Sequence, residues 1–413
     1  MIPAAALRLV LAAAAALPLA GAERPVRPLA HEAYLWQRHW TPALRAAIRN
    51  STDLVGAFRV QAARADARGR LKPVAVDWAA LAASGRPAVA VVRIEGQLAG
   101  FDEAALLDSL TAFAAALPRG SAPIAGLEID HDCATARLPA YGRFLARLRA
   151  ALDGAPGRLR LSVTALPAWT ASPHLAGILA PVDEAVLQVH AVLSPAHGLF
   201  DAVLSPAHGL FDGGRAADWV RAFAARSPKP FRVALPAYGA RVGFREDGRI
   251  ASVESEAPLL AGGEAPLELA AAPQEVAAFL RVLERDAPAG LAGVVWFRLP
   301  TGADRRAWSL ETWRAVVRGA DLGSAVAIRL RPSGIPGTRD VVLVNEGALD
   351  GNLPATVDLP PGCAADGVAG YALDRTGPDP VLRRLQPGIL RGGAERAIGW
   401  TRCAAEAEPD ARS

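Results

Sequence analysis

The chain has 413 residues, of which 52% are hydrophobic, and its formal net charge at pH 7 is +4. This length and apolar content predict one large domain with a smaller one beside it. The charge is nearly balanced and no basic run is interleaved with aromatic residues, which argues against a nucleic-acid surface.

The first 22 residues have the pattern of a signal peptide. Arg8 supplies the positive charge, Leu9 to Leu19 is an apolar run, and Ala20-Gly21-Ala22 forms a cleavage site. A retained anchor is the alternative, although the apolar run is short for a membrane helix. We therefore expect a mature chain that begins at Glu23, is exported to the periplasm or outside the cell, and has no membrane span.

From residue 33 to residue 317, short apolar runs alternate with amphipathic segments. The expected strands span 33–38, 54–61, 87–95, 124–133, 158–165, 184–192, 231–238 and 291–299. The expected helices span 41–49, 76–83, 101–117, 141–148, a short stretch near 175, 216–225, 274–285 and 310–317.

Eight strand-helix units predict an α/β fold, a (β/α)₈ TIM-type barrel that occupies residues 23–322. A doubly wound open sheet is the structural alternative. No glycine-rich dinucleotide fingerprint follows the first strand, and we expect no cofactor.

The pattern changes after residue 322. Short apolar runs with Gly and Pro between them predict a small β-sandwich-like appendage over 323–413. Cys363 and Cys403 both lie in it and could form a disulfide in an exported protein. Cys133 would then remain as a buried, inert thiol.

An eleven-residue segment occurs twice in tandem, at 191–201 and 202–212, without a single difference. Ser-Pro and His-Gly pairs indicate a loop. One interpretation is a neutral insertion, because lengthening a loop costs little entropy. The other is a flap that brings His197 or His208 near a site at the barrel rim.

The segment from Ile124 to Cys133 carries the strongest functional signal. Residues two apart in a strand share a face, so Glu128, Asp130 and Asp132 point the same way. Three carboxylates on one face are unfavourable in a dry core, because burial and like charges both raise their pKa values. The pattern indicates a strand that ends in a polar site, and one acid should hold a proton near neutral pH. Asp132 is our candidate because it lies nearest the rim.

Other side chains at the predicted strand ends would surround these acids, since barrel active sites form at the carboxyl ends of the strands. Aromatic faces stack on sugar rings, and acids bind hydroxyls and transfer protons. A polysaccharide or oligosaccharide therefore suits the set. The candidate substrate-binding residues are Trp36, Arg38, Arg93, Glu95, Gln188, His190, Tyr238, Trp296 and Arg298.

Two stretches resemble known families. Glu128-Ile129-Asp130-His131-Asp132 resembles the D-x-D-x-E end of the fourth-strand motif in family 18 glycoside hydrolases, the chitinase-like barrels. Leu235-Pro236-Ala237-Tyr238-Gly239 is similar to that family's P-x-Y-G segment, and Trp296 falls where the family places a tryptophan under the sugar. The chain from Tyr34-Leu35-Trp36-Gln37-Arg38 onward looks closer still to domain of unknown function 3142, which has no established activity.

The family 18 resemblance implies that Asp132 is the general acid and that Asp130 orients the substrate's acetamido group. The sequence departs from the family pattern at three places. An Asp replaces the acidic Glu, Glu128 replaces an Asp, and the sixth strand offers Gln188 and His190 instead of a tyrosine.

Three functions stay open at this point. The first is a glycoside hydrolase that uses Asp132, Asp130 and Glu128, and the second is a non-catalytic glycan-binding barrel. The third is a metal-dependent hydrolase that uses the three acids with His190, although no H-E-x-x-H pair is present. We expect a monomer.

Overall fold

The computed structural model describes residues 28–37, 39–66, 68–96, 102–118, 124–154, 158–190, 210–244, 250–254, 264–304, 306–377, 380–386 and 388–403. The predicted signal peptide, Arg38, His197 and His208 lie outside these residues. None of the helices in the described part has the length and apolar character that a membrane span requires.

Eight parallel strands close into a barrel, which confirms the predicted TIM-type fold. Around the barrel their order is β1, β12, β8, β7, β6, β5, β4, β2, and β2 then pairs with β1. That last pairing overturns the open-sheet alternative. The strands are β1 (Ala30–Leu35), β2 (Ala57–Ala65), β4 (Ala88–Ile94), β5 (Ile124–His131), β6 (Arg160–Ala165), β7 (Glu184–Gln188), β8 (Phe231–Pro236) and β12 (Leu291–Phe297).

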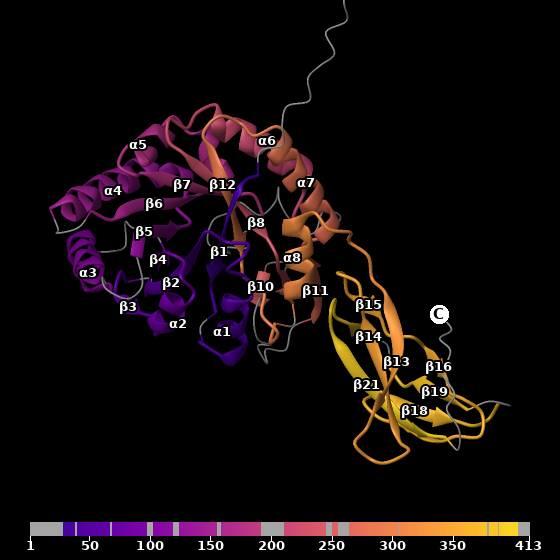
Figure 1. Ribbon diagram of the computed structural model, residues 1–413. Helices are drawn as coiled ribbons and strands as arrows, with labels where there is room; N and C mark the ends of the chain where they lie inside the picture. Colours follow the sequence, from indigo (N-terminus) through magenta and orange to yellow (C-terminus); the bar gives the residue numbers. More distant parts are fainter. Residues whose placement is uncertain are drawn as a thin grey trace, which may run out of the picture.

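Helices cover the outside of the barrel (Figure 1). Their apolar stripes explain why they pack there, and polar caps fix two of their starts as the sequence predicts. The Thr41 hydroxyl accepts a hydrogen bond from the Leu44 N–H, and Asp102 accepts from Ala104 and Ala105. The helices are α1 (Pro42–Arg49), α2 (Trp78–Ala83), α3 (Glu103–Ala116), α4 (Leu138–Asp153), α5 (Leu175–Leu179), α6 (Gly213–Ala224), α7 (Pro273–Arg285) and α8 (Leu310–Arg318).

The main hydrophobic core lies between the strands and these helices. Cys133 is buried there, as predicted, and burial raises the pKa of its thiol to about 12. The inside of the barrel holds a smaller apolar cluster of Tyr34, Val91, Val186, Ala234 and Val295. Both faces of most strands are therefore apolar, as expected for parallel strands.

An antiparallel sheet that the sequence did not predict is inserted between β8 and α7. It consists of β9 (Gly239–Phe244), β10 (Ile250–Glu254) and β11 (Glu264–Ala270), with β9 in the middle. A further short strand, β3 (Leu71–Pro73), pairs antiparallel with β2. The insertion begins directly after Tyr238 and so extends one side of the barrel's carboxyl end.

The C-terminal part is all-β, and it lies beside the barrel beyond α8 (Figure 1). It forms three antiparallel sheets, and a disulfide joins Cys363 to Cys403 as predicted. Its strands are β13 (Val326–Pro332), β14 (Arg339–Asn345), β15 (Gly351–Asn352), β16 (Thr356–Asp358), β17 (Ala364–Gly367), β18 (Tyr371–Asp374), β19 (Val381–Arg384), β20 (Ile389–Leu390) and β21 (Glu395–Arg402).

Gly293 allows β12 to approach Arg232, a partly buried arginine on β8. Its φ is +153°, and a Cβ there would lie 2.2 Å from the Ala30 carbonyl oxygen and 2.6 Å from Arg232 Nη1. We expect Gly293→Ala to lower the free energy of unfolding by about 1–3 kcal/mol. The added methyl group can be accommodated only if β1 and β12 move apart or the Arg232 guanidinium moves away. Urea unfolding measures this. Gly177→Ala, where a Cβ meets nothing within 4 Å, is the control; equal effects from both would contradict the packing argument.

Candidate functional site

Two of the three predicted acids, Glu128 and Asp130, lie on β5, the fourth strand of the barrel, and Asp132 directly follows its last residue. Glu128 is completely buried, whereas Asp130 and Asp132 are 4% and 5% exposed and follow it toward the carboxyl end. Their neighbours on β4 are set by the parallel register, which pairs Val91 with Glu128 and Arg93 with Asp130. The three carboxylates consequently meet different partners at successive levels of the barrel.

Glu128 lies deepest and has a full set of hydrogen-bond donors. The Tyr34 hydroxyl donates to its Oε1 over 2.5 Å, and Ser162 and Thr164 donate over 3.3 Å each. Arg59 forms an ion pair with its Oε2. A carboxylate so completely paired joins four strands of the barrel, and this environment suits a structural role.

Below Glu128 lies a buried ion network that the sequence analysis missed. Arg59 is 1% exposed and contacts Glu32 at 2.6 Å and Glu184 at 3.1 Å in addition to Glu128. Arg232 bridges the same Glu32 and Glu184 at 3.0 and 2.6 Å. Burial alone would lower the pKa of Arg59, but the three carboxylates together raise it. The sequence does carry one sign of this network, because each of four otherwise apolar strands contains a charged residue.

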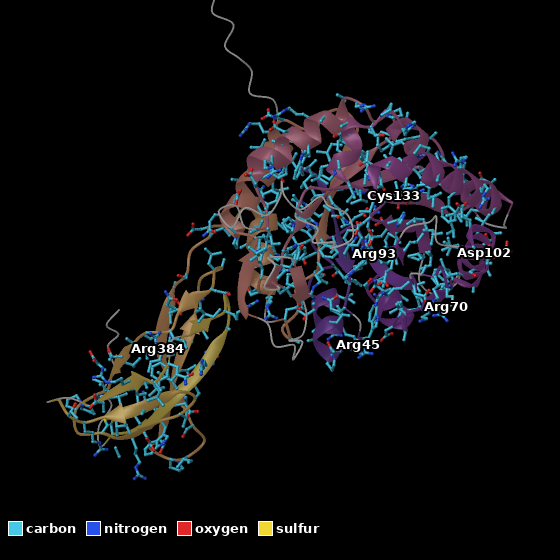
Figure 2. All side chains as sticks on the ribbon, turned by 180° about the vertical axis from the view of Figure 1, so that it is seen from behind. Arg45, Arg70, Arg93, Asp102, Cys133 and Arg384 are labelled. Carbon is cyan, nitrogen blue, oxygen red and sulfur yellow. A yellow bond between two sulfur atoms is a disulfide. The ribbon has the colours of Figure 1, made fainter. Side chains whose placement is uncertain are left out.

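Arg93 brings the two upper acids together. Its Nη1 contacts Asp130 Oδ1 at 3.0 Å, and its Nη2 forms an ion pair with Asp132 Oδ2. The Arg93 side chain is 23% exposed, so this end of the barrel is reached by solvent. Figure 2 shows Arg93 among the barrel strands, well apart from Arg384 in the C-terminal sheets. Asp132 Oδ1 has no hydrogen-bond partner among the described residues, which leaves an acceptor available to a ligand.

The raised pKa falls on Asp130. Burial is the largest cause, Arg93 opposes it, and the charges of Asp132 and Glu128 add to it, so that the pKa of Asp130 reaches about 6. The sequence analysis expected one acid to hold a proton near neutral pH and chose Asp132. In the structure the raised pKa belongs to Asp130, two residues before Asp132.

Aromatic side chains from four other strand ends, those of β1, β7, β8 and β12, contact one another across the barrel. Phe297 packs against Trp36 at 5.5 Å, Tyr238 at 5.4 Å and His190 at 5.4 Å between ring centroids. Tyr34 links this group to the acids, since its ring contacts Trp36 and Phe297 and its hydroxyl donates to Glu128. Trp36 and Phe297 are partly exposed. The structure thus brings the predicted Trp36, His190 and Tyr238 together, and it adds Phe297.

His190 and Tyr238 also form a polar pair. The Tyr238 hydroxyl lies 3.4 Å from His190 Nδ1, and burial raises the pKa of the phenol above its usual value. The sixth strand therefore places an imidazole where the family 18 pattern has a tyrosine, and the seventh strand supplies a phenol next to it. This pair gives the site a second proton donor and acceptor beside the carboxylates.

The structure corrects the placement of Trp296. Its side chain is fully buried in the core between the barrel and its helices, in contact with Trp308 and Trp313. Its Nε1 donates to His31 Nδ1 over 3.1 Å. Val295 and Phe297 take the inner face of β12, so Trp296 must take the outer face. Trp296 therefore cannot stack on a sugar in this barrel, and Phe297 occupies the corresponding inner position.

The remaining predicted residues differ in their surroundings. Glu95 is half-exposed and forms an ion pair with Arg64 on β2. Arg298 is buried and contacts Asp304 at 2.6 Å. Gln188 is 8% exposed, and its Oε1 has no hydrogen-bond partner in the described part of the chain. Gln188 thus has a polar atom at the end of a barrel strand that no described residue bonds.

The metal-dependent alternative requires a group of side chains that can hold a metal ion. Within the ranges that the structure describes, no three His, Cys, Asp or Glu residues are grouped so that they could hold a metal ion. His190 is engaged with Tyr238 and Phe297.

The raised pKa of Asp130 predicts a pH-dependent stability. Its folded pKa is about 6 and its ordinary value 3.8, so its contribution is fully present below pH 4 and is lost as the pH rises through 6. Relative to Asp130→Asn, we expect the free energy of unfolding of the wild type to fall by about 3 kcal/mol between pH 4 and pH 7. Urea unfolding of both proteins across this range measures the difference. A difference that stays constant with pH would contradict the raised pKa.

The chain is similar to solved structures of low sequence identity. The Bacillus megaterium QM B1551 spore cortex-lytic enzyme SleL is 13% identical with a TM-score of 0.50, over 71% of this chain and 75% of that one. The corresponding Bacillus cereus enzyme is 15% identical with a TM-score of 0.49, over 71% and 75%. A chitinase from Chromobacterium violaceum ATCC 12472 is 16% identical with a TM-score of 0.47, over 70% and 98%. No curated protein matches this chain.

Two family models match the sequence. Domain of unknown function 8456 (DUF8456) matches residues 328–404 in the C-terminal sheets. Domain of unknown function 3142 (DUF3142) matches residues 84–205 and 201–302, which together are more than half of the chain and include the acids, His190, Tyr238 and Phe297. The chain therefore belongs to the DUF3142 family.

Proposed function

We propose that this protein is an exported glycoside hydrolase that cleaves a cell-wall or extracellular polysaccharide by carboxylate acid/base catalysis. The observation that carries the proposal is the Arg93 bridge between Asp130 and Asp132, at the carboxyl end of the fourth barrel strand. Two neighbouring carboxyl groups, one of which has a raised pKa, are what acid-assisted cleavage of a glycosidic bond needs. The partly exposed Trp36 and Phe297 supply faces on which a sugar ring can stack.

The roles follow from position along β5. Asp132, nearest the rim and with a free Oδ1, donates a proton to the glycosidic oxygen. Asp130, deeper and with a pKa of about 6, holds the proton of the pair in the free protein and passes it to Asp132 when substrate binds, so that Asp132 carries the proton it donates. The Asp130 carboxylate that remains stabilises positive charge that develops on the sugar. Arg93 keeps both carboxylates in place. Glu128 takes no part in proton transfer, because its acceptors are already used.

Export is part of the proposal for two reasons. The first 22 residues have the signal-peptide pattern. The disulfide between Cys363 and Cys403 suits an oxidising compartment. The solved structures that share the fold include spore cortex-lytic enzymes and a chitinase, which makes peptidoglycan and chitin the first substrates to test.

A non-catalytic glycan-binding barrel is the second candidate, and the same Arg93 favours it. Asp132 is already engaged in an ion pair with Arg93, and this contact must be broken before the carboxyl can act on a substrate. The sixth strand also carries His190 instead of the tyrosine of the family 18 pattern. A hydrolase must overcome this ion pair when substrate binds, whereas a binding protein need not.

The two candidates are separated by product release and binding measured together. The panel comprises peptidoglycan glycan strands, chitohexaose and exported bacterial polysaccharides, with reducing ends as the readout and calorimetry for affinity. A hydrolase releases reducing ends from at least one member. Binding without release by the wild type would favour the binding barrel. A wild type that neither binds nor cleaves any member of the panel would contradict both candidates.

A further inference from the structure

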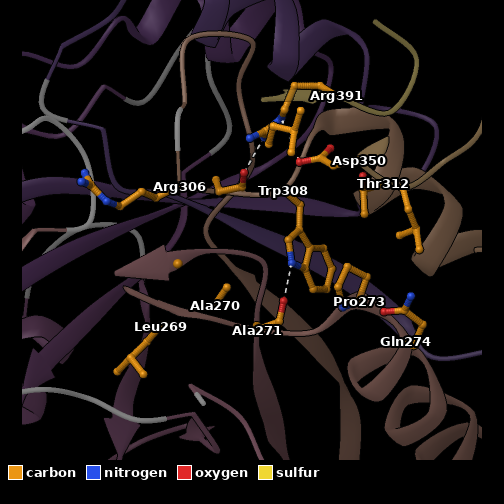
Figure 3. Close-up of a pocket in the computed structure, with 14 residues that line it drawn as sticks. Leu269, Ala270, Ala271, Pro273, Gln274, Arg306, Trp308, Thr312, Asp350 and Arg391 are labelled. Atoms are coloured by element: carbon orange, nitrogen blue, oxygen red, sulfur yellow. Dashed lines mark hydrogen bonds and ion pairs between the residues drawn. The ribbon is translucent and has the colours of Figure 1, made fainter. Parts of the chain in front are cut away.

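A second cavity lies where the barrel meets the C-terminal sheets. It has a volume of about 440 Å³ and is lined by residues from β9, β11, α7 and α8 on one side and by residues from the C-terminal part on the other. Figure 3 shows Trp308 near its centre, with Pro273 and Gln274 on one side and Asp350 and Arg391 on another. Its volume falls in the range of small-ligand sites, about 300–1,000 Å³.

The cavity adjoins the segment that follows the seventh barrel strand, β8. Gly239, which lines it, directly follows Tyr238 of the candidate site. The Trp308 N–H donates to the Ala237 carbonyl over 3.0 Å, and the Ala271 N–H donates to the Tyr238 carbonyl over 3.2 Å. A Cβ on Gly239 would lie 2.8 Å from two carbonyl oxygens, so these segments are in close contact. The cavity therefore lies beside the strand end that carries Tyr238 of the candidate site.

The walls offer both apolar faces and hydrogen-bonding groups. The Trp308 Nε1 donates to the Ala271 carbonyl over 2.8 Å, which fixes the indole in the wall. Ile389 is 54% exposed, although large apolar side chains are usually covered. It lines this cavity, whereas the equally exposed Ile335, Val368 and Leu385 do not. An exposed isoleucine at the entrance of a cavity is what a ligand with an apolar face would cover.

The polar groups are held in fixed positions. Arg391 donates to the Ala307 carbonyl across the junction and lies 3.6 Å from Asp350. Asp350 in turn accepts from the Gly392 N–H over 3.1 Å. A neighbouring carboxylate and guanidinium can accept from and donate to adjacent hydroxyls. An arginine already paired with a carboxylate and a carbonyl is a weak anion site, so this chemistry favours a hydroxyl-rich ligand.

We propose that this cavity is an accessory subsite that holds the same glycan chain several sugar units away from the carboxylates. The inference takes its ligand class from the proposed function and adds that the C-terminal sheets supply part of the substrate site. Ile389 covers the C–H face of a sugar, and Asp350, Arg391 and Gln274 bind its hydroxyls. The C-terminal part thereby selects long chains over short ones.

The junction itself is well bonded in the part that the structure describes. Besides the Arg391 contact, the Thr312 hydroxyl of α8 donates to the Ala348 carbonyl over 2.6 Å. These bonds do not involve Ile389. A substitution at Ile389 can therefore change the ligand surface while the junction stays intact.

The test compares Ile389→Gln with the control Ile335→Gln, both in the full chain. Ile335 is 63% exposed in the same C-terminal part but does not line the cavity. For Ile389→Gln we expect KM for peptidoglycan glycan strands and the Kd of chitohexaose to rise roughly fivefold, from the lost apolar contact. KM for a disaccharide glycoside should not change, and Ile335→Gln should match the wild type on every probe.

Each contrary outcome identifies what fails. Wild-type behaviour of Ile389→Gln on long substrates, with active enzyme, overturns the subsite and leaves the proposed function standing. An equal rise in KM for the disaccharide glycoside also overturns it, because the effect would not depend on chain length. A wild type that neither binds nor cleaves any glycan overturns the proposed function, and the subsite with it.

Discussion

Replacing Arg59 by methionine should lower the free energy of unfolding by about 3–5 kcal/mol, because breaking a buried ion pair leaves charges without partners. Arg59 is 1% exposed and pairs with Glu32, Glu128 and Glu184. Methionine fills a similar volume but supplies no charge. Glu32 and Glu184 then retain Arg232, whereas Glu128 loses the one cation with which it pairs among the described residues. The expected loss is a large part of the stability of a typical domain.

Urea unfolding measures this loss, and two further proteins test its cause. Arg158→Met removes an arginine that is 69% exposed and pairs with Asp183 at 3.2 Å, and it should cost less than about 1 kcal/mol. Adding Glu128→Gln to Arg59→Met should restore part of the stability, because the unpaired charge is then removed as well. A loss below about 1 kcal/mol for Arg59→Met, or no recovery in the double variant, would contradict the network as described.

Asp132→Asn should reduce glycan cleavage by about 10²–10⁴-fold, the usual effect of losing a general acid. The amide keeps the shape of the carboxyl and can still bind a ligand, but it cannot donate a proton usefully. Because Asp132 is paired with Arg93 at the rim, the substitution should change the melting temperature by only a few degrees. Glycan affinity should stay close to that of the wild type.

Turnover, affinity and melting curves of Asp132→Asn are compared with those of Asp218→Asn. Asp218 lies on α6 with a 72% exposed side chain, and its replacement should leave all three measurements unchanged. An Asp132→Asn protein that unfolds early and loses binding would indicate a structural role for the carboxylate. Wild-type turnover would remove Asp132 from the reaction.

The sequence predicted the barrel because its strands and helices differ in hydrophobic period, which is a local property. It missed β9 to β11 because that insertion is broken by glycines and prolines and has no long apolar run. The pairing within the ion network also could not be predicted from a local sequence pattern. Glu32 and Arg59 meet only because the barrel closes between β1 and β2, a contact that no local pattern specifies.

The candidate site was predicted in part for a similar reason. Alternation places Glu128, Asp130 and Asp132 on one face, and the structure keeps them there. On β12 both faces are apolar, so alternation could not decide whether Trp296 or Phe297 points inward. The raised pKa of Asp130 is caused mainly by burial in the closed barrel and is opposed by Arg93 on the neighbouring strand, and neither effect is visible in the segment that carries Asp130.

The most direct test of the account is the release of reducing ends from peptidoglycan glycan strands and chitohexaose by the wild type and by Asp132→Asn, in parallel and at matched concentrations of folded protein. We predict release by the wild type from at least one of them and a loss of about 10²–10⁴-fold in the variant, with glycan affinity retained. Equal release by the two proteins, or binding without release by the wild type, would contradict carboxylate catalysis at Asp132.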